Sequence, residues 1–174
     1  MKKLQTITLG CSKNKVDTEH ILSQVEDLYE IIPEGEDIPV HTILLNTCGF
    51  IGDAKEESIQ AVLEAVERKG KGEAEKVIVF GCLSQRYMSE LPALIPEVDA
   101  WFGAREFDPV IRELGAEPSA EKSADRYLTT PSHYAYLKIS EGCDRRCSYC
   151  AIPFIRGQHK SVPMEDLVEE ATRL

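Results

Sequence analysis

The sequence has no apolar stretch that approaches the roughly 20 residues needed to span a lipid bilayer. Its longest apolar runs have the length of a strand, "HTILLN" at residues 41–46 and "KVIVFG" at residues 76–81. The N-terminal "MKKLQTITLG" carries two lysines, but its apolar part is too short, and too interrupted by threonine, for a signal peptide. We therefore expect a cytoplasmic protein without a membrane partner.

Positive charge is also scarce, with 20 lysines and arginines against 30 aspartates and glutamates and a net charge of −10. An acidic surface does not attract a phosphate backbone, so a nucleic acid is disfavoured as a direct substrate and a basic partner is favoured. The four histidines show no spacing typical of metal ligands and are given no role; they are His20, His41, His133 and His159.

Cysteine, in contrast, is plentiful, with six in 174 residues. Stable disulfides are rare in reducing compartments, and the spacing does not suggest pairs. Three cysteines are scattered, and we call them the first triplet: Cys11, Cys48 and Cys82. Three are crowded together, and we call them the second triplet: Cys143, Cys147 and Cys150.

Residues 1–115 alternate strand and helix signals. Repeated strand–helix units predict an α/β fold with a doubly wound parallel sheet. The expected strands cover residues 4–10, 41–46, 76–81 and 98–103, and the expected helices cover residues 15–29, a segment from residue 53, residues 84–91 and residues 108–114. Asn14 is the expected N-cap of the first helix, and residues 53–56 resemble a capping box.

Residues 116–131 are small, polar and rich in proline, which indicates a linker. A second domain is expected at residues 132–174, with the strand "YAYLKIS", a cysteine loop and a helix that starts near residues 162–164 with Pro163 in its first turn. This second part looks incomplete. We therefore expect a fragment that is inactive alone, with residues after about Pro131 disordered or packed without specificity.

The first triplet follows three expected strands, and each cysteine has a glycine beside it. Because parallel sheets bind ligands at the carboxyl ends of their strands, the three thiols are expected to meet at one edge. A cysteine in a protein is often just a small buried apolar side chain, but three repeats of one pattern favour a shared site. Three thiolates suit an iron–sulfur cluster better than catalytic zinc, although a structural zinc with one outside ligand stays open.

The second triplet forms a C-x3-C-x2-C pattern within "SEGCDRRCSYCAIPFIRG". A zinc knuckle with a borrowed ligand and a redox C-x-x-C pair are the alternatives. Neither alternative explains three thiols in one loop after a strand, whereas three cysteines can hold a four-iron cluster and leave one iron open for substrate. Tyr149, just before the last cysteine, is expected to pack against the cofactor.

The C-x3-C-x-aromatic-C pattern resembles the signature of the radical S-adenosylmethionine superfamily. "GCSKNKVDTE", "NTCGFIGDAKEESI" and "GCLSQRY" resemble the cysteine segments of the methylthiotransferase family in that superfamily. The resemblance covers essentially the whole chain. Lys13-Asn14 and Gly49-Phe50-Ile51 look like the branch that modifies an aspartate of ribosomal protein S12, rather than the branch that modifies tRNA.

This resemblance implies two [4Fe-4S] clusters and S-adenosyl-L-methionine. The second triplet would hold the cluster that cleaves S-adenosylmethionine, with Tyr149 on the cofactor side, and the first triplet would hold an auxiliary cluster that supplies sulfur. The fold implied is a methylthiotransferase N-terminal domain followed by the first βα segment of a radical enzyme's partial (β/α) barrel. The implied reaction adds a methylthio group to the aspartate β-carbon of S12, with flavodoxin or ferredoxin as electron donor.

Other residues carry less weight. Arg145, Arg146 and Arg156 flank the second triplet and either offset cluster charge, meet substrate or lie on the surface. Lys13 either reaches a cluster sulfide or is solvated. The competing functions are tRNA methylthiolation and a zinc-stabilised binding module without catalysis.

Overall fold

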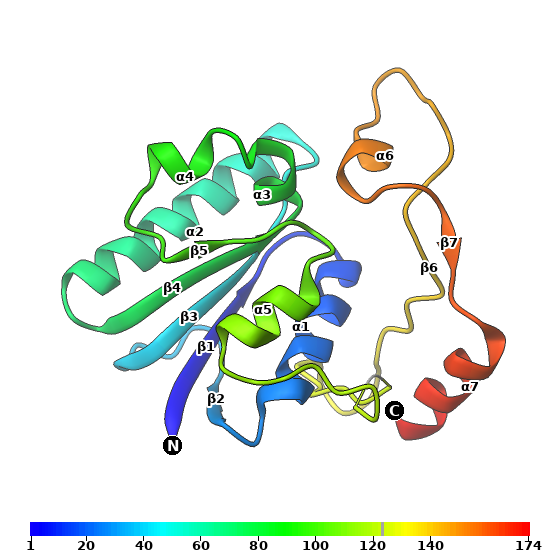
Figure 1. Cartoon of the computed structure of the whole chain (residues 1–174), viewed down its shortest axis with the longest axis horizontal. Helices are drawn as coiled ribbons and strands as arrows, with labels where there is room; N and C mark the ends of the chain where they lie inside the picture. Colours follow the sequence, from blue (N-terminus) through cyan, green and yellow to red (C-terminus); the bar gives the residue numbers. More distant parts are fainter. Residues whose placement is uncertain (123) are drawn as a thin grey trace.

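The computed structural model describes residues 1–122 and 124–174. Its first part is a sheet of parallel strands with helices on both faces (Figure 1), as the alternating signals predict. The strand order is β2-β1-β3-β4-β5. The strands are β1 (Lys2–Thr8), β2 (Tyr29–Ile32), β3 (Val40–Thr47), β4 (Ala74–Gly81) and β5 (Ala100–Trp101).

This order reverses direction between β1 and β3, which is the topological switch point where doubly wound sheets bind ligands. Thr8 of β1 pairs with Asn46 of β3, and Thr47 of β3 pairs with Gly81 of β4. The carboxyl ends of these three strands are therefore level with one another, and the loops that follow them lie at one edge of the sheet.

Helices pack on both faces of the sheet. The helices are α1 (Ser12–Val25), α2 (Gly52–Gly70), α3 (Cys82–Tyr87), α4 (Leu91–Leu94) and α5 (Phe107–Glu113). Alternate residues of β4 serve the two faces, since Ile78 packs with the residues of α1 and α5, whereas Val77 and Val79 pack with Val62 of α2. Burial on both faces accounts for the nearly continuous apolar sequences of β3 and β4.

The first helix differs from the prediction in both bounds. It begins at Ser12 and ends at Val25, not at residues 15 and 29, because Tyr29 belongs to β2, a strand that the sequence reasoning missed. The expected N-cap is also wrong. Asn14 lies inside α1, fully buried, and the N-cap position is Cys11, whose side chain makes no capping bond.

The other helix predictions need smaller corrections. The expected capping box of α2 is wrong, because its N-cap is Ile51 and no side chain caps it. The apolar residues of α2 are not all buried, since Val62 is buried but Leu63 is 45% exposed. The single helix expected at residues 84–91 is two short helices, α3 and α4.

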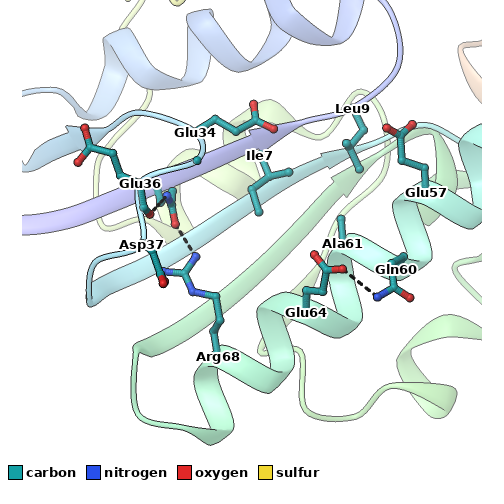
Figure 2. Close-up of a pocket in the computed structure, with 12 residues that line it drawn as sticks. Ile7, Leu9, Glu34, Glu36, Asp37, Glu57, Gln60, Ala61, Glu64 and Arg68 are labelled. Carbon is teal, nitrogen blue, oxygen red and sulfur yellow. Dashed lines mark hydrogen bonds between the residues drawn. The ribbon is translucent and has the colours of Figure 1, made fainter.

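No helix follows β2 within residues 33–39, which are all described. This part of the sheet face is left as a groove of about 440 Å³ beside α2, with Ile7, Leu9 and Ala61 among its lining (Figure 2). Arg68 closes one end by donating from Nη1 to Gln5 Oε1 at 2.6 Å. The remaining lining residues that carry charge are acidic: Glu34, Glu36, Asp37, Glu57 and Glu64.

The rest of the chain extends beside α1 (Figure 1). It contains β6 (Ser140–Glu141), α6 (Ile152–Ile155), β7 (Lys160–Ser161) and α7 (Met164–Arg173). The expected strand at residues 134–140 is wrong, since only its last residue lies in β6, which pairs antiparallel with β7. The expected last helix is present, and Pro163 stands at its N-cap.

The predicted linker at residues 116–131, of which residue 123 lies outside the described residues, is held to α1 by a buried ion pair. Arg126 donates to the Glu19 carboxylate from Nε at 3.1 Å and also from Nη2. Both side chains are at most 1% exposed. Arg126 Nη1 also donates to Glu170 of α7 at 2.7 Å. These contacts join α1, the linker and α7. The domain boundaries and the lack of order after residue 131 stay predictions.

In the part of the chain that the structure describes, no helix is both long and apolar enough to cross a membrane.

Candidate iron–sulfur site

The first triplet lies at one edge of the sheet, as the sequence predicts for the ends of parallel strands. Cys11 is the N-cap residue of α1, Cys48 directly follows β3, and Cys82 is the first residue of α3 after β4. Three residues far apart in the sequence are thus carried to neighbouring loops. Their role as ligands stays a prediction.

Glycines let these loops approach one another closely. A Cβ built at Gly10 would lie 2.6 Å from Cys48 Cβ and 2.8 Å from Cys48 Sγ. At Gly81 φ is +110°, and a Cβ there would lie 2.6 Å from Asn46 Oδ1. Any side chain at these positions would push the cysteine loops apart, which gives a physical reason for the glycines beside Cys11 and Cys82.

Asn14 stands between the thiols. Its Oδ1 lies 3.9 Å from both Cys11 Sγ and Cys82 Sγ, so those two sulfurs cannot be more than twice that distance apart. Its Nδ2 donates to Leu9 O at 2.8 Å and to Thr47 O at 3.3 Å, the two segments that lead into Cys11 and Cys48. Asn14 therefore fixes the backbone that leads into Cys11 and Cys48 instead of capping a helix.

The backbone of Cys48 is fixed from α2. Ser58 Oγ accepts from Cys48 N at 2.9 Å and donates to Cys48 O at 2.9 Å. Ser58 is fully buried, so this paired contact holds the cysteine in place without competition from water.

Cys82 is the buried member of the triplet, at 6% exposure, whereas Cys11 is exposed. Burial raises the pKa of the Cys82 thiol, and the nearby Arg156 guanidinium opposes that rise. Cys82 packs with Ala104 and with Ile155 and Ala151, which follow the second triplet in the sequence.

Arg156 is the residue that sequence reasoning placed least well. It is 3% exposed, which excludes an ordinary surface arginine. Its Nε donates to Cys82 Sγ at 3.2 Å, its Nη1 donates to Asp17 Oδ2 at 2.7 Å, and its Nη2 donates to Asn14 Oδ1. Burial acts to lower the pKa of Arg156, but the carboxylate of Asp17 and the other groups around it leave the pKa above its usual value.

The second triplet lies in one excursion of the chain between β6 and β7. Cys143 N donates to Gly157 O at 3.0 Å, which closes the base of the loop. All three cysteines line a cavity of about 790 Å³, together with Arg146. The single-loop arrangement agrees with the short spacing in the sequence.

The remaining predicted residues divide into those near the cavity and those away from it. Arg145 and Arg146 are exposed, and only Arg146 lines the cavity. Tyr149 is 87% exposed and does not line it, so its place on the cofactor side stays a prediction. Lys13 is neither free nor directed at a thiol, because its Nζ donates to Ser140 O at 3.4 Å and lies 3.9 Å from Glu141 Oε1.

Both triplets have the donor chemistry that an iron–sulfur cluster needs, since all six cysteines are free thiols. Within residues 1–122 and 124–174 no three cysteine, histidine or carboxylate side chains are already gathered as metal ligands. The glycine-enforced approach of Cys48 to Gly10 and the cavity at the second triplet nevertheless fit such a group at each site. The residues present therefore fit one iron–sulfur cluster at each triplet.

The sequence held usable signals for part of what was missed. Ile31-Ile32 before Pro33 marks the β-branched end of β2. Nothing in the local sequence shows that Asn14, Asp17 and Arg156 meet, because the contacts join residues up to 142 positions apart.

Comparison with known proteins gives a consistent result. The model of the uncharacterized protein family UPF0004 matches residues 3–103, which include the sheet and the first triplet. A Bacteroides thetaiotaomicron protein named ribosomal protein uS12 methylthiotransferase RimO is 50% identical over 174 residues, which are 99% of this chain and 40% of the relative.

Two further relatives carry the same name. The Porphyromonas gingivalis protein is 51% identical over 173 residues, 99% of this chain and 40% of the relative. The Chlorobium chlorochromatii protein is 51% identical over 168 residues, 97% of this chain and 38% of the relative. The chain thus spans about two-fifths of the length of these relatives.

Proposed function

Since the match of residues 3–103 shows that the chain belongs to the uncharacterized protein family UPF0004, we propose that it forms part of a methylthiotransferase for ribosomal protein S12. The proposed reaction adds a methylthio group to the β-carbon of an S12 aspartate by radical S-adenosylmethionine chemistry. The name that the relatives carry supports the substrate. The observation that carries the chemistry is the presence of two separate cysteine triplets, one at the sheet edge and one lining a cavity.

In this proposal Cys11, Cys48 and Cys82 would hold an auxiliary [4Fe-4S] cluster. Gly10 and Gly81 leave the loops room to close around it, and Asn14 and Ser58 keep the cysteine backbones in register. Because the helix α1 begins directly after Cys11, its N-terminal dipole favours the negative charge that thiolates bring.

The residues Cys143, Cys147 and Cys150 would hold the second [4Fe-4S] cluster in their loop. When bound, the clusters and S-adenosyl-L-methionine would supply the electron, the methyl group and the sulfur for the transfer. The chain's own part is to fix the two triplets relative to each other, which Cys82, Ile155 and Arg156 do by direct contact. Arg146 lines the same cavity and contributes positive charge to its wall.

A basic substrate protein suits the chain's net charge of −10 and its acidic groove better than a tRNA does (Figure 2). Six free cysteines suit a reducing compartment, so we place the reaction in the cytoplasm with flavodoxin or ferredoxin as electron donor.

The first test is metal analysis of this chain after anaerobic reconstitution. We expect up to about eight irons and matching sulfide per chain, and about half of each when either triplet is replaced by alanine. One or two zinc ions without sulfide would instead show a zinc-binding module.

The second test offers the full-length protein S12 and tRNA in separate reactions with S-adenosylmethionine and a reductant. We expect the mass of a methylthio group to appear on S12 and not on tRNA. Modified tRNA beside unmodified S12 would contradict the substrate assignment.

A further inference from the structure

Arg156 lies between the two cysteine triplets. It follows the second triplet by only six positions, at the end of α6, yet its guanidinium lies among residues of the first triplet's edge. Its side chain is 4% exposed, so the contacts are made away from water.

Each nitrogen of the guanidinium has its own acceptor. Nε donates to Cys82 Sγ at 3.2 Å, and Nη2 donates to Asn14 Oδ1, the oxygen that lies 3.9 Å from both Cys11 Sγ and Cys82 Sγ. Nη1 donates to Asp17 Oδ2 at 2.7 Å and to Glu141 Oε2 at 2.9 Å. A planar fork suits such divergent acceptors, whereas a lysine ammonium cannot reach all of them together.

The two carboxylates that bind Arg156 do not explain why its Nε faces the sulfur of Cys82. Asp17 already has Lys138 beside it, and Lys138 Nζ also lies 3.2 Å from Glu141 Oε2. Arg156 meets both carboxylates through Nη1 alone, so these ion pairs do not require its Nε to face a sulfur. The short helix α6 also delivers Ile155 and Ala151 against Cys82, so the whole turn after the second triplet is aimed at this thiol.

We propose that Arg156 is a positioning residue of the first triplet, which holds the Cys82 sulfur by a charge-assisted hydrogen bond and fixes the second triplet's loop against it. This inference rests on the proposed cluster at the first triplet. Hydrogen bonds to ligand sulfurs and nearby positive charge favour the reduced, more negative form of an iron–sulfur cluster. Arg156 therefore raises the reduction potential of the auxiliary cluster. It also fixes the position of the second triplet's loop relative to the first triplet.

The test measures the midpoint potential of the auxiliary cluster alone. The 174-residue chain is prepared with Cys143, Cys147 and Cys150 replaced by alanine, reconstituted anaerobically and followed by electron paramagnetic resonance during a redox titration. Relative to this parent, R156Q lowers the equilibrium constant for one-electron reduction about tenfold, a fall of about 59 mV in midpoint. R156K keeps the charge and recovers at least half of that change.

Arg68 provides the matched control. Its side chain is only 19% exposed, it is paired with Glu73, and it donates to Gln5 Oε1 and to Ile38 O, none of which belongs to a cysteine or to the docked C-terminal residues. R68Q therefore also removes a largely buried guanidinium, but it changes the equilibrium constant for reduction of the auxiliary cluster less than twofold.

The outcomes separate the inference from the function on which it rests. Iron bound in the parent with the same midpoint in R156Q overturns the inference alone. A parent that binds no iron overturns the cluster assignment, and the inference with it. If R156Q does not fold, R156M carries the same test, since it removes the same charge and donors while Lys138 still neutralises Asp17.

Discussion

The first cysteine triplet is assembled from three loops far apart in the sequence, whereas the second lies in one loop between two short strands. Packing of a whole sheet determines where Cys11, Cys48 and Cys82 lie, because each follows a strand of fixed register. Local turns such as the bond from Cys143 N to Gly157 O determine the second loop. A substitution that disturbs the sheet should therefore displace the cysteines of the first triplet. A substitution in the loop between β6 and β7 should affect the second triplet alone.

The largest expected effect breaks the link between these two regions. Replacing Glu19 by alanine leaves Arg126 buried with one carboxylate fewer, which destabilises the docked C-terminal residues by about 3–5 kcal/mol. Hydrogen exchange should quicken at residues 126–173 while β3 and β4 keep their protection. Glu117 supplies the control, since its exposed pair with Arg112 is worth about 0–1 kcal/mol. Equal exchange in the two variants would show that Arg126 does not hold these residues.

The second effect concerns the sheet edge. Gly81→Ala places a Cβ 2.6 Å from Asn46 Oδ1 at a φ of +110°, so we expect a loss of about 2–4 kcal/mol in the free energy of unfolding. Urea denaturation measures it. Gly35 has a similar φ of +88° but nothing within 4 Å of an added methyl group, so Gly35→Ala should cost only about 1 kcal/mol. Similar losses in both variants would mean that the close approach at Gly81 is unimportant.

The third effect compares thiols of the two triplets in the metal-free chain. Cys147 is exposed, while Cys82 is 6% exposed and its thiol pKa is raised by burial. Iodoacetamide should therefore alkylate Cys147 at least about tenfold faster than Cys82 at neutral pH, because only an accessible thiolate reacts. Mass spectrometry of timed digests gives both rates. Equal rates would contradict the buried position of Cys82.

The smallest expected effect is a pH dependence at the junction of α1 and α7. Burial lowers the pKa of His20 despite the nearby Glu170, so the unfolded chain binds a proton at this histidine before the folded chain does. The free energy of unfolding is therefore unaffected by His20 above about pH 6.5, the pKa of a histidine in the unfolded chain. It falls as the pH drops from there toward the lower pKa of His20 in the folded chain. His20→Gln should flatten this dependence by less than about 1 kcal/mol in thermal unfolding, whereas the exposed His133→Gln should not.

The sequence predicted those features of the fold that depend on neighbouring residues, and it did not predict those that depend on contacts between distant residues. The strands β1, β3 and β4 follow from apolar runs, and their common edge follows from parallel topology, so the first triplet's placement was predictable. Asn14 was misassigned as a cap because capping rules consider only the local chain, whereas its partners Leu9 and Thr47 are fixed by the sheet. The burial of Arg156 depends on how the loop after the second triplet docks, and no local pattern encodes that docking.

The docking of Ile155 and Arg156 over Cys82 has a consequence for the order in which the protein is made. Cys82 and Arg156 are 74 residues apart. At ordinary rates of translation the ribosome needs about 4–15 seconds to add that many residues. Within this interval the last strand of the sheet, β5, is made, while Ala151 and Ile155, which later cover Cys82, do not yet exist. Synthesis itself thus leaves a period in which Cys82 is open to solvent, before the residues that follow the second triplet cover it.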